Sequence, residues 1–586
     1  MAPCMKRRMK FPLGKCPRGH RPSLAVRSSV RRGPFGLSVA RGCCAQGVRV
    51  LRFGAVEAVA AIELILLLLA VVAAVTLFAA RLRVPYPIPM VVAGLGIGLL
   101  PGVTHVELEP ELVLALFLPP ILFSAAFFLS PRELWRNVRP ISLLAVGLVF
   151  TTTLAVAAVV MAMAPHLGWP VAIALGAIVS PPDAIAATSI ARQLNLPRRL
   201  VIIFEGESLV NDATALTTYR LAVAAVGVSG AFDFGGAAIS FVTVAVGGAI
   251  VGLVVGWVAA WLLSLLEDPP VEVLISLLVP FSAYLPAERL GVSGVLATVA
   301  AGLYVGFRAP RIMQSNTRLL GTATWKMVIF VVNGLAFLLI GLQLPTVIAD
   351  LEGYPAGELI GLAAAVTLTV IIVRLVWVYP ATYLPRWLIP SVARRDPAPP
   401  ARVPLILGWG GMRGAVSLAA ALALPLPFPD RGLVIFLAFT VILVTLIGQG
   451  LTLPALIRFL GVVDDGTVEH EETHAREAAT AAALVRLEEL RSEVPGHLPL
   501  IDQLKERYEH RGEHLVHDDG DEPTPTVTDD MSAEEVEELE HDEIRRAVIS
   551  AERLAVLDLR DRGEISDDAL RRIERDLDLD ELRREA

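Results

Sequence analysis

The chain has 586 residues, of which 54% are hydrophobic and 19% are charged, and its mean hydropathy is +0.62. Its apolar residues form runs of roughly 16 to 30 between residues 58 and 460, which are long enough to cross a bilayer as helices. A soluble domain carries about 25% charged residues and lacks such runs, so this composition excludes a soluble fold. The net charge of −7 sums a basic start, a nearly neutral middle and an acidic end, and gives no reason to expect a nucleic-acid partner.

We expect three regions: a basic extension at 1–55, a transmembrane domain at 56–460 in the lipid bilayer, and an acidic, helical, cytoplasmic tail at 461–586. The extension is rich in Lys, Arg, Gly and Pro and lacks the compact apolar segment of a secretory signal. Its composition favours a disordered segment or a reading frame assigned too far upstream, and a basic organellar transit peptide is the alternative. All four cysteines lie in it, so we expect no disulfide framework or thiolate metal site in the transmembrane domain.

The apolar runs predict thirteen membrane helices and hence an all-α polytopic fold. Their approximate ranges are 58–80, 86–101, 112–130, 138–164, 170–192, 199–224, 235–265, 271–287, 291–307, 325–345, 356–384, 404–425 and 431–459. Basic loops follow the odd-numbered helices, as at Arg81 and Arg83 after the first and at Arg394 and Arg395 after the eleventh. By the positive-inside rule, the N-terminus then lies outside and the C-terminus lies in the cytoplasm.

The tail carries helical stretches near 469–493 and 532–579, separated by the polar segment HDDGDEPTPTVTDD. Its charge density and scarce aromatic residues predict a solvated, partly disordered region. Some of its histidines have a spacing that suits a metal site or a pH sensor, but the surrounding carboxylates and the lack of cysteine favour solvated surface side chains. These histidines are His470, His474, His510, His514 and His517.

The segment Phe204–Leu216, FEGESLVNDATAL, places three carboxylates within eight residues of an apolar run. A charged side chain at the bilayer centre costs at least about 2.5 to 3.5 kcal/mol, so it normally faces a cavity or a partner and marks a functional site. Glu207 and Asn211 are four residues apart, as are Ser208 and Asp212, so each pair shares a helix face. This polar stripe predicts a site for a proton or a small cation.

The fifth predicted helix contains Ser180-Pro181-Pro182-Asp183. Two consecutive prolines remove two backbone donors and clash with the preceding turn, so we expect the helix to break near Ser180. A membrane tolerates a break only where the freed carbonyls face protein or a water-filled cavity. Asp183 would begin the resumed half-helix, and its carboxylate with the freed carbonyls would form a hard-oxygen site suited to Na⁺.

The twelfth predicted helix has a glycine-rich irregularity at 408–416, GWGGMRGAV. Dividing the thirteen helices into 1–6 and 8–13 puts the two interrupted helices at matching places in two inverted repeats, which is typical of a transporter's substrate site. Arg413 in this segment is a buried cation, and we predict Glu207 as its partner in a structural brace, because a guanidinium would repel a bound cation. We interpret Arg374 and Lys326 as snorkelling or structural charges.

These motifs together resemble a known family. GESLVNDATAL resembles the Asn-Asp signature of the monovalent cation/proton antiporters, the bacterial sodium/proton antiporters related to animal sodium/proton exchangers. SPPDAIAA, FLPPILF, NGLAFLLIGLQLP and GWGGMRGAVSLA look like the same family over residues 58–460, and the tail's AVLDLRDRGEISDDALRRIERDLDLDE is similar to bacterial members. The resemblance implies a thirteen-helix inverted-repeat fold, a homodimer in the bacterial plasma membrane, and an elevator-like core around helices five and twelve.

The resemblance also implies roles for individual side chains. Those assigned to cation and proton binding are Asp212, Asp183, Asn211 and Ser208, with Na⁺ at the two aspartates, and those assigned to the structural ion pair are Glu207 and Arg413. Additional lining is expected from Ser180, Pro182 and Ser124. The chain departs from the family at two of these positions, because members often have Thr in place of Pro182 and some have a carboxylate in place of Ser124. Both departures bear on ion selectivity.

The sequence therefore predicts a secondary transporter rather than an enzyme, in which Na⁺, Li⁺ or K⁺ competes with a proton for Asp212 and which regulates intracellular pH and sodium. A single aspartate beside the neutral Asn211 indicates electroneutral exchange, mainly through the resemblance. The chain has no G-x-x-x-x-G-K-[ST] motif, and no cofactor is expected besides the transported ions. The alternatives are an intramembrane aspartyl protease with an Asp183–Asp212 dyad, which leaves Arg413 and the paired breaks unexplained, and a channel or receptor with a passive polar core.

Overall fold

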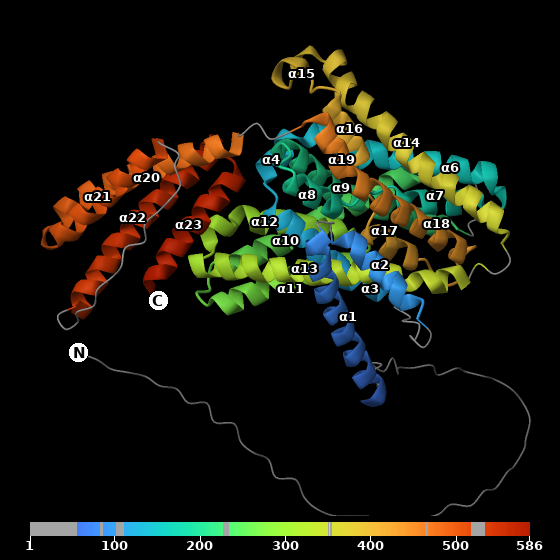
Figure 1. The fold of residues 1–586 in the computed structure, drawn as a ribbon, viewed down its shortest axis with the longest axis horizontal. Helices are drawn as coiled ribbons and strands as arrows, with labels where there is room; N and C mark the ends of the chain where they lie inside the picture. The colour runs from blue at the N-terminus through green and yellow to red at the C-terminus, as the bar shows by residue number, and fades with distance from the viewer. Residues whose placement is uncertain are drawn as a thin grey trace, which may run out of the picture. The chain divides into compact units, whose positions relative to one another are not determined.

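In the computed structural model, all regular secondary structure in the described part of the chain is helical (Figure 1). The described residues are 55–82, 86–100, 110–226, 234–349, 351, 354–462, 467–516 and 534–585. The all-α prediction is therefore confirmed. The predicted extension at 1–55 lies outside the described residues except for Ala55.

Each apolar run that predicted a membrane helix coincides with a helical segment. The bounds are α1 (Ala55–Leu82), α2 (Pro87–Gly98), α3 (Pro110–Phe128), α5 (Val138–Ser142) continuing into α6 (Val149–Met163), α7 (Gly168–Val179), α8 (Ala184–Gln193), α9 (Arg198–Ala225), α10 (Phe234–Leu263), α11 (Pro269–Arg289), α12 (Gly294–Ile312), α13 (Ser315–Ala349), α14 (Ala356–Leu388), α16 (Arg402–Trp409), α17 (Ala415–Leu422), α18 (Arg431–Val444) and α19 (Gly450–Leu460). Short helices α4 (Pro131–Arg136) and α15 (Pro390–Arg395) lie between them. Seven of the described helical segments are long and apolar enough to cross a membrane, and the total of thirteen spans and the inverted repeat stay predictions.

Two helices are interrupted where the sequence predicted a break. Helix α7 ends at Val179 and α8 begins at Ala184, because Pro181 and Pro182 cannot supply the amide donors of a continuous turn. Helix α16 ends at Trp409 and α17 begins at Ala415, with glycines at both ends of the intervening segment. Residues 445–449 between α18 and α19 form a π-helical turn, a feature often found at functional sites.

The apolar helices form two groups around the interrupted segments. One group, called here the site group, comprises α7, α8, α9, α16 and α17, which belong to a large apolar core shared with α14 and α18. The other, called here the scaffold group, comprises α10, α11, α12 and α13, whose own core includes Leu263, Ala301 and Trp325. Helices α3 and α13 contribute to both cores, with Leu122 and Leu338 in the first and Phe123 and Trp325 in the second.

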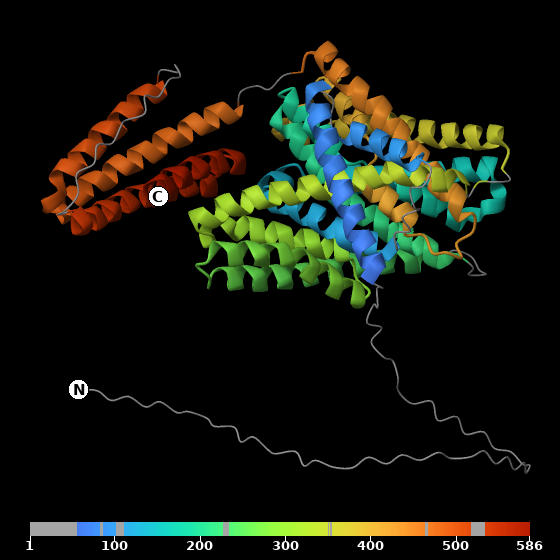
Figure 2. The same cartoon turned by 60° about the horizontal axis from the view of Figure 1, so that its bottom comes forward.

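The described residues of the tail form four α-helices that pack on one another (Figures 1 and 2). They are α20 (Thr467–Glu493), α21 (Leu498–Val516), α22 (Glu534–Arg562) and α23 (Asp567–Glu585). The predicted single stretch at 532–579 is two helices, because Gly563 adopts a left-handed conformation with φ of 78° and ends α22. The prediction of a solvated tail is wrong for the described residues: Ala475, Val556 and Ile573 are buried in a common core. The segment HDDGDEPTPTVTDD lies outside the described residues.

Candidate functional site

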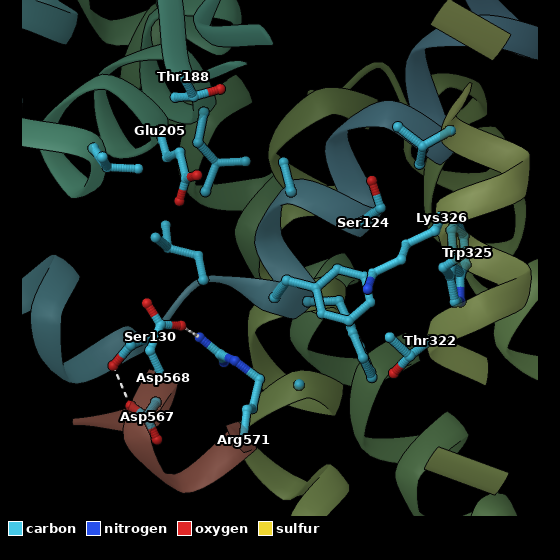
Figure 3. A pocket seen from close by; sticks show the side chains of 18 of the residues that line it. Ser124, Ser130, Thr188, Glu205, Thr322, Trp325, Lys326, Asp567, Asp568 and Arg571 are labelled. Carbon is cyan, nitrogen blue, oxygen red and sulfur yellow. Dashed lines mark hydrogen bonds and ion pairs between the residues drawn. The ribbon is translucent and has the colours of Figure 1, made fainter. Parts of the chain in front are cut away.

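A cavity of about 1240 Å³ is lined by side chains from both helix groups. The site group contributes Asp183, Ser208 and Asp212 to its wall. In Figure 3, Thr188 and Glu205 lie on one side of this cavity, and Ser124 of α3 lies on the other side near Lys326 of α13. The sequence-predicted aspartates therefore line one cavity although they come from separate helices.

The break between α7 and α8 is held open by bonds to its own freed groups. The carboxylate of Asp183 caps α8 by accepting from the amide of Ile185 at 2.8 Å, and the amide of Asp183 donates to the carbonyl of Met412 at 2.7 Å. The second bond joins the two interrupted helices directly. These two bonds pair the buried backbone amides of Asp183 and Ile185, which have no partner within a continuous helix at the break.

Helix α9 lays its polar stripe against this break. The side-chain amide of Asn211 donates to the carbonyl of Pro182 at 3.1 Å, and the hydroxyl of Ser208 accepts from the amide of Ala184 at 3.4 Å. Asn211 is fully buried and Asp212 is 4% exposed. Asn211, which bonds to the break, directly precedes Asp212, which lines the cavity. The contact between α9 and the break therefore fixes the position of Asp212.

The glycines of the second break are needed for close approach rather than for an unusual φ. A Cβ atom on Gly414 would lie 1.6 Å from Oδ2 of Asp183, and one on Gly411 would lie 2.1 Å from Cδ of Arg374. Any other residue at either position would displace a charged side chain. The glycines between α16 and α17 therefore let the side chains of Asp183 and Arg374 approach this backbone closely.

The predicted ion pair between Glu207 and Arg413 is wrong, because Glu207 pairs with Arg374 of α14. Nη2 of Arg374 lies 2.9 Å from Oε2 of Glu207 and also donates to the carbonyl of Leu407 at 3.0 Å, and both charged side chains are 1% exposed. The physical reason is the space above Gly411, through which Arg374 reaches Glu207. An arginine in the middle of the apolar run VTLTVIIVRLVWV was the signal for this pair.

Arg413 has a different environment. Its Nη1 donates to the carbonyl of Ser180, and its amide donates to the hydroxyl of Thr445 at 3.2 Å in the π-helical turn. Nε and Nη2 of Arg413 have no hydrogen-bond partner within the described part of the chain. The guanidinium is fully buried, so it places one positive charge at the crossing of the two breaks.

Three predicted lining residues have different outcomes. Pro182 and Ser124 line the cavity, and Ser124 donates to the carbonyl of Ile121 at 3.1 Å. Ser180 does not line the cavity. Its hydroxyl donates to the carbonyl of Ala177 at 2.9 Å, and the carbonyl of Ser180 accepts from Arg413.

Buried carboxylates that were not predicted as site residues also line the cavity: Glu272 of α11 and Asp567, Glu574 and Asp578 of α23. Glu272, in the first turn of α11, is fully buried, and neither of its oxygens has a hydrogen-bond partner among the described residues. The hydroxyl of Thr317 on α13 is likewise buried without a partner and lines the same cavity. Glu272 lies at the start of a predicted helix, where a charged residue is ordinary, so no signal in the sequence marked it as a site residue. The described residues hold no cluster of three or more His, Cys, Asp or Glu placed to bind a metal, including the histidines of α20.

Comparisons with known proteins agree with this architecture. The family model of the transmembrane sodium/hydrogen exchanger matches residues 66–459. An uncharacterized Na⁺/H⁺ exchanger of Mycobacterium tuberculosis is 34% identical over 536 residues, which is 88% of this chain and 96% of that protein. The sodium, potassium, lithium and rubidium/H⁺ antiporter of Bacillus pumilus is 36% identical over 395 residues, which is 64% of this chain and 58% of that protein.

The fold is also shared with a solved structure. The sodium proton antiporter MjNhaP1 from Methanocaldococcus jannaschii, at pH 8, matches with a TM-score of 0.53 and 20% identity over 69% of this chain and 100% of that one. The family match covers both interrupted helices, the polar stripe of α9 and Arg374. The chain therefore belongs to the transmembrane sodium/hydrogen exchanger family.

Proposed function

We propose that the protein exchanges a monovalent cation for a proton at Asp212, with Asp183 and Ser208 as further oxygen ligands. The observation that carries this proposal is the pair of carboxylates on one cavity wall beside two crossed helix breaks. Asp212 accepts no hydrogen bond within the described part of the chain, so its oxygens are available to a cation or a proton. Competition for the same oxygens couples the two fluxes.

The surrounding charges support one proton for one cation. Glu207 and Arg374 form a closed neutral pair that leaves no charge for the site. Asp183 and Asp212 with Arg413 then sum to a formal charge of −1, from −1 −1 +1. One bound monovalent cation or one proton neutralises that sum, which fits electroneutral exchange because an unpaired buried charge is costly.

Asn211 has a positioning role in this proposal. Its amide nitrogen holds the carbonyl of Pro182, and its Oδ1 has no hydrogen-bond partner among the described residues. A neutral side chain at this place supports the break without adding a second titratable charge next to Asp212. Na⁺ is the proposed cation, and Li⁺ and K⁺ are candidates because the Bacillus pumilus relative is named for sodium, potassium, lithium and rubidium.

The proposal includes a cellular setting. Bacterial relatives and apolar helices support a multi-pass protein of the plasma membrane that regulates internal pH and sodium. The basic loops support an external N-terminus and a cytoplasmic tail. A homodimer is proposed from the family resemblance alone.

The test is proton movement in vesicles that contain the purified full-length chain. Adding Na⁺, Li⁺ or K⁺ outside should release a preset proton gradient in wild type, and Asp212→Asn should abolish this response for all three. Asp268→Asn is the matched control, because Asp268 is exposed, caps α11 and keeps its cap as Asn. Exchange that persists in Asp212→Asn would remove Asp212 from the site, and cation flux without proton movement would indicate a channel.

A further inference from the structure

The tail helices contact both helix groups that line the cavity. On the site group, Arg198 at the start of α9 pairs with Asp568 of α23, with Nη2 and Oδ2 3.2 Å apart. On the scaffold group, Arg318 of α13 pairs with Asp578 of α23, with Nε and Oδ2 3.0 Å apart. One rigid helix therefore bridges the helix that carries Asp212 and the helix that forms the opposite wall.

Other contacts strengthen the bridge at three places. Ser130, the N-cap of α4, is hydrogen-bonded to Asp567, as Figure 3 shows. Nη2 of Arg132 lies 3.1 Å from Oδ1 of Asp561 at the end of α22. Arg553 of α22 donates to the hydroxyl of Ser315 at 3.0 Å at the start of α13.

The same part of the tail forms a wall of the cavity. Asp567, Asp568, Arg571, Glu574 and Asp578 line the cavity that Asp183 and Asp212 also line. Figure 3 shows Asp567, Asp568 and Arg571 on the red ribbon of α23, facing the cavity. Helix α23 and the two aspartates therefore line one cavity.

We propose that α22 and α23 form an inhibitory latch. The latch holds the site group and the scaffold group in one arrangement, and α23 closes the side of the cavity that it lines. The latch rests on the proposed exchange function. Alternating access requires one group of helices to move against the other. A helix that is ion-paired to both groups opposes that movement, so exchange should require α23 to leave Arg198, Arg318 or both.

Two carboxylates, the buried Glu574 and the partly buried Glu133, make the latch sensitive to pH. Burial raises the pKa of Glu574 on α23 to about 6. Arg318 of α13, Arg553 of α22 and Arg571 of α23 face Glu574 and oppose the shift, while Asp578 adds to it. Oε1 of Glu574 has no hydrogen-bond partner in the described part of the chain, so ionisation would leave a buried charge poorly compensated.

The second carboxylate is Glu133 of α4, whose pKa burial raises to about 7. Arg198 opposes this shift, and Asp567 and Asp568 of the docked α23 add to it. Arg571 also lies within electrostatic reach. The raised value depends in part on the tail being docked, because the two aspartates belong to α23.

The sign of the effect follows from linkage. A group whose pKa is higher in the docked state stabilises docking below its undocked pKa and loses that contribution as the pH rises through the docked value. Glu574 and Glu133 therefore favour the latch at acidic pH and weaken it as the pH rises past about 6 to 7. Neighbouring arginines lower the pKa of Asp568 and Asp561. The ion pairs Arg198–Asp568 and Arg132–Asp561 therefore persist between pH 6 and 7. The latch should open on the alkaline side.

A reversible cross-link tests the latch directly. Ser130→Cys with Asp567→Cys places two thiols where a side-chain hydrogen bond now lies, in a full-length chain whose four cysteines are changed to serine. We expect oxidation to slow Na⁺-driven proton movement in vesicles at pH 8 by about tenfold or more, since tethering fixes the docked state, and a reductant to restore it. Equal rates before and after reduction, with the cross-link shown by a gel shift, would overturn the latch while leaving exchange intact. Absence of exchange in wild type would instead remove the proposed function and the latch with it.

A charge variant tests the pH dependence. Glu574→Gln mimics the protonated side chain, so it should keep the latch closed and lower the exchange rate at pH 8 about threefold, with little change at pH 6. Glu488→Gln is the matched control, because Glu488 is an exposed tail carboxylate. Arg318→Asp should raise exchange at pH 6, and adding Asp578→Arg should reverse that rise by restoring the pair. A Glu574→Gln rate profile that matches wild type at both pH values would overturn the pH mechanism.

Discussion

The two interrupted helices meet at one place but are built from different residues. The α7–α8 break comes from two prolines and ends in the carboxylate of Asp183. The α16–α17 break comes from glycines and carries the guanidinium of Arg413. The proline break frees carbonyls that Asn211 and Arg413 then occupy, whereas the glycine break removes Cβ atoms so that neighbouring charges can approach.

This difference separates two tasks within one site. The proline break supplies carbonyl acceptors for Asn211 and Arg413, and it places the negative charge of Asp183 on the cavity wall, where we propose that the ion binds. The glycine break supplies space, through which Arg374 neutralises Glu207 away from the cavity. A change that affects only space should therefore act on stability and geometry, and a change that affects only charge should act on pH dependence.

The largest expected effect is on the pair that crosses the glycine break. Arg374→Met leaves Glu207 buried without its partner and should lower the free energy of unfolding by about 3 to 5 kcal/mol. Thermal unfolding of the protein in detergent measures the loss. Adding Glu207→Gln should recover much of it, because the uncompensated charge is then absent.

The control for this prediction is Arg395→Met, which removes an exposed arginine and should leave unfolding nearly unchanged. If Arg413→Met proved as destabilising as Arg374→Met, and Glu207→Gln rescued only the Arg413 variant, the pairing described here would be contradicted.

The second prediction concerns space alone. Gly414→Ala puts a methyl group 1.6 Å from Oδ2 of Asp183, so the carboxylate or the backbone must move. A displacement of about 1 Å at a reacting site can cost about 100-fold in rate, and we expect a loss of that size in vesicle exchange. Gly357→Ala is the matched control, since a Cβ there meets nothing within 4 Å. Wild-type exchange by Gly414→Ala would show that Asp183 tolerates displacement.

Much of this architecture follows from local sequence. Apolar runs predict the helices, because a bilayer requires continuous hydrogen-bonded segments, and Pro181, Pro182 and the glycines at 408–414 mark the breaks through backbone chemistry. The stripe of Ser208, Asn211 and Asp212 follows from helical periodicity. These features depend on neighbours in the chain, so one sequence is enough to infer them.

The missed features depend on contacts between distant segments. Helical periodicity does not decide whether Glu207 pairs with Arg374 or with Arg413, because both arginines lie outside α9. The space at Gly411 decides it, and only the packed helices reveal that space. The tail illustrates the same limit, because its buried positions Ala475, Val556 and Ile573 come from three helices. Each of these helices is highly charged, so a solvated tail was the natural prediction.

The third prediction concerns charge alone. Arg413→Gln removes the positive charge at the crossing but leaves the Glu207–Arg374 pair in place, so the site's formal charge changes from −1 to −2. Exchange should then reach half its maximum at a pH about one unit higher, because protons bind the more negative site more tightly. The pH profile of exchange in vesicles measures this shift, with Arg413→Lys as the control that keeps the charge. Unchanged profiles for both variants would exclude Arg413 from the electrostatics of the site.

The smallest expected effect tests the departure from the family pattern at the proline break. Pro182→Thr adds a hydroxyl next to Asp183 while keeping the carbonyl that Asn211 holds, and Pro181 still prevents a continuous helix. One added hydrogen-bonding or ligand group contributes about 0.5 to 1.5 kcal/mol, so we expect the ratio of Li⁺ to Na⁺ activity to change by about threefold, with exchange retained. The amide of Asp183 should keep its bond to the carbonyl of Met412, because that bond uses backbone atoms that the substitution leaves in place. Loss of exchange in Pro182→Thr would show that both prolines are needed to hold the break, and the division between a proline break that supplies ligands and a glycine break that supplies space would then be too simple.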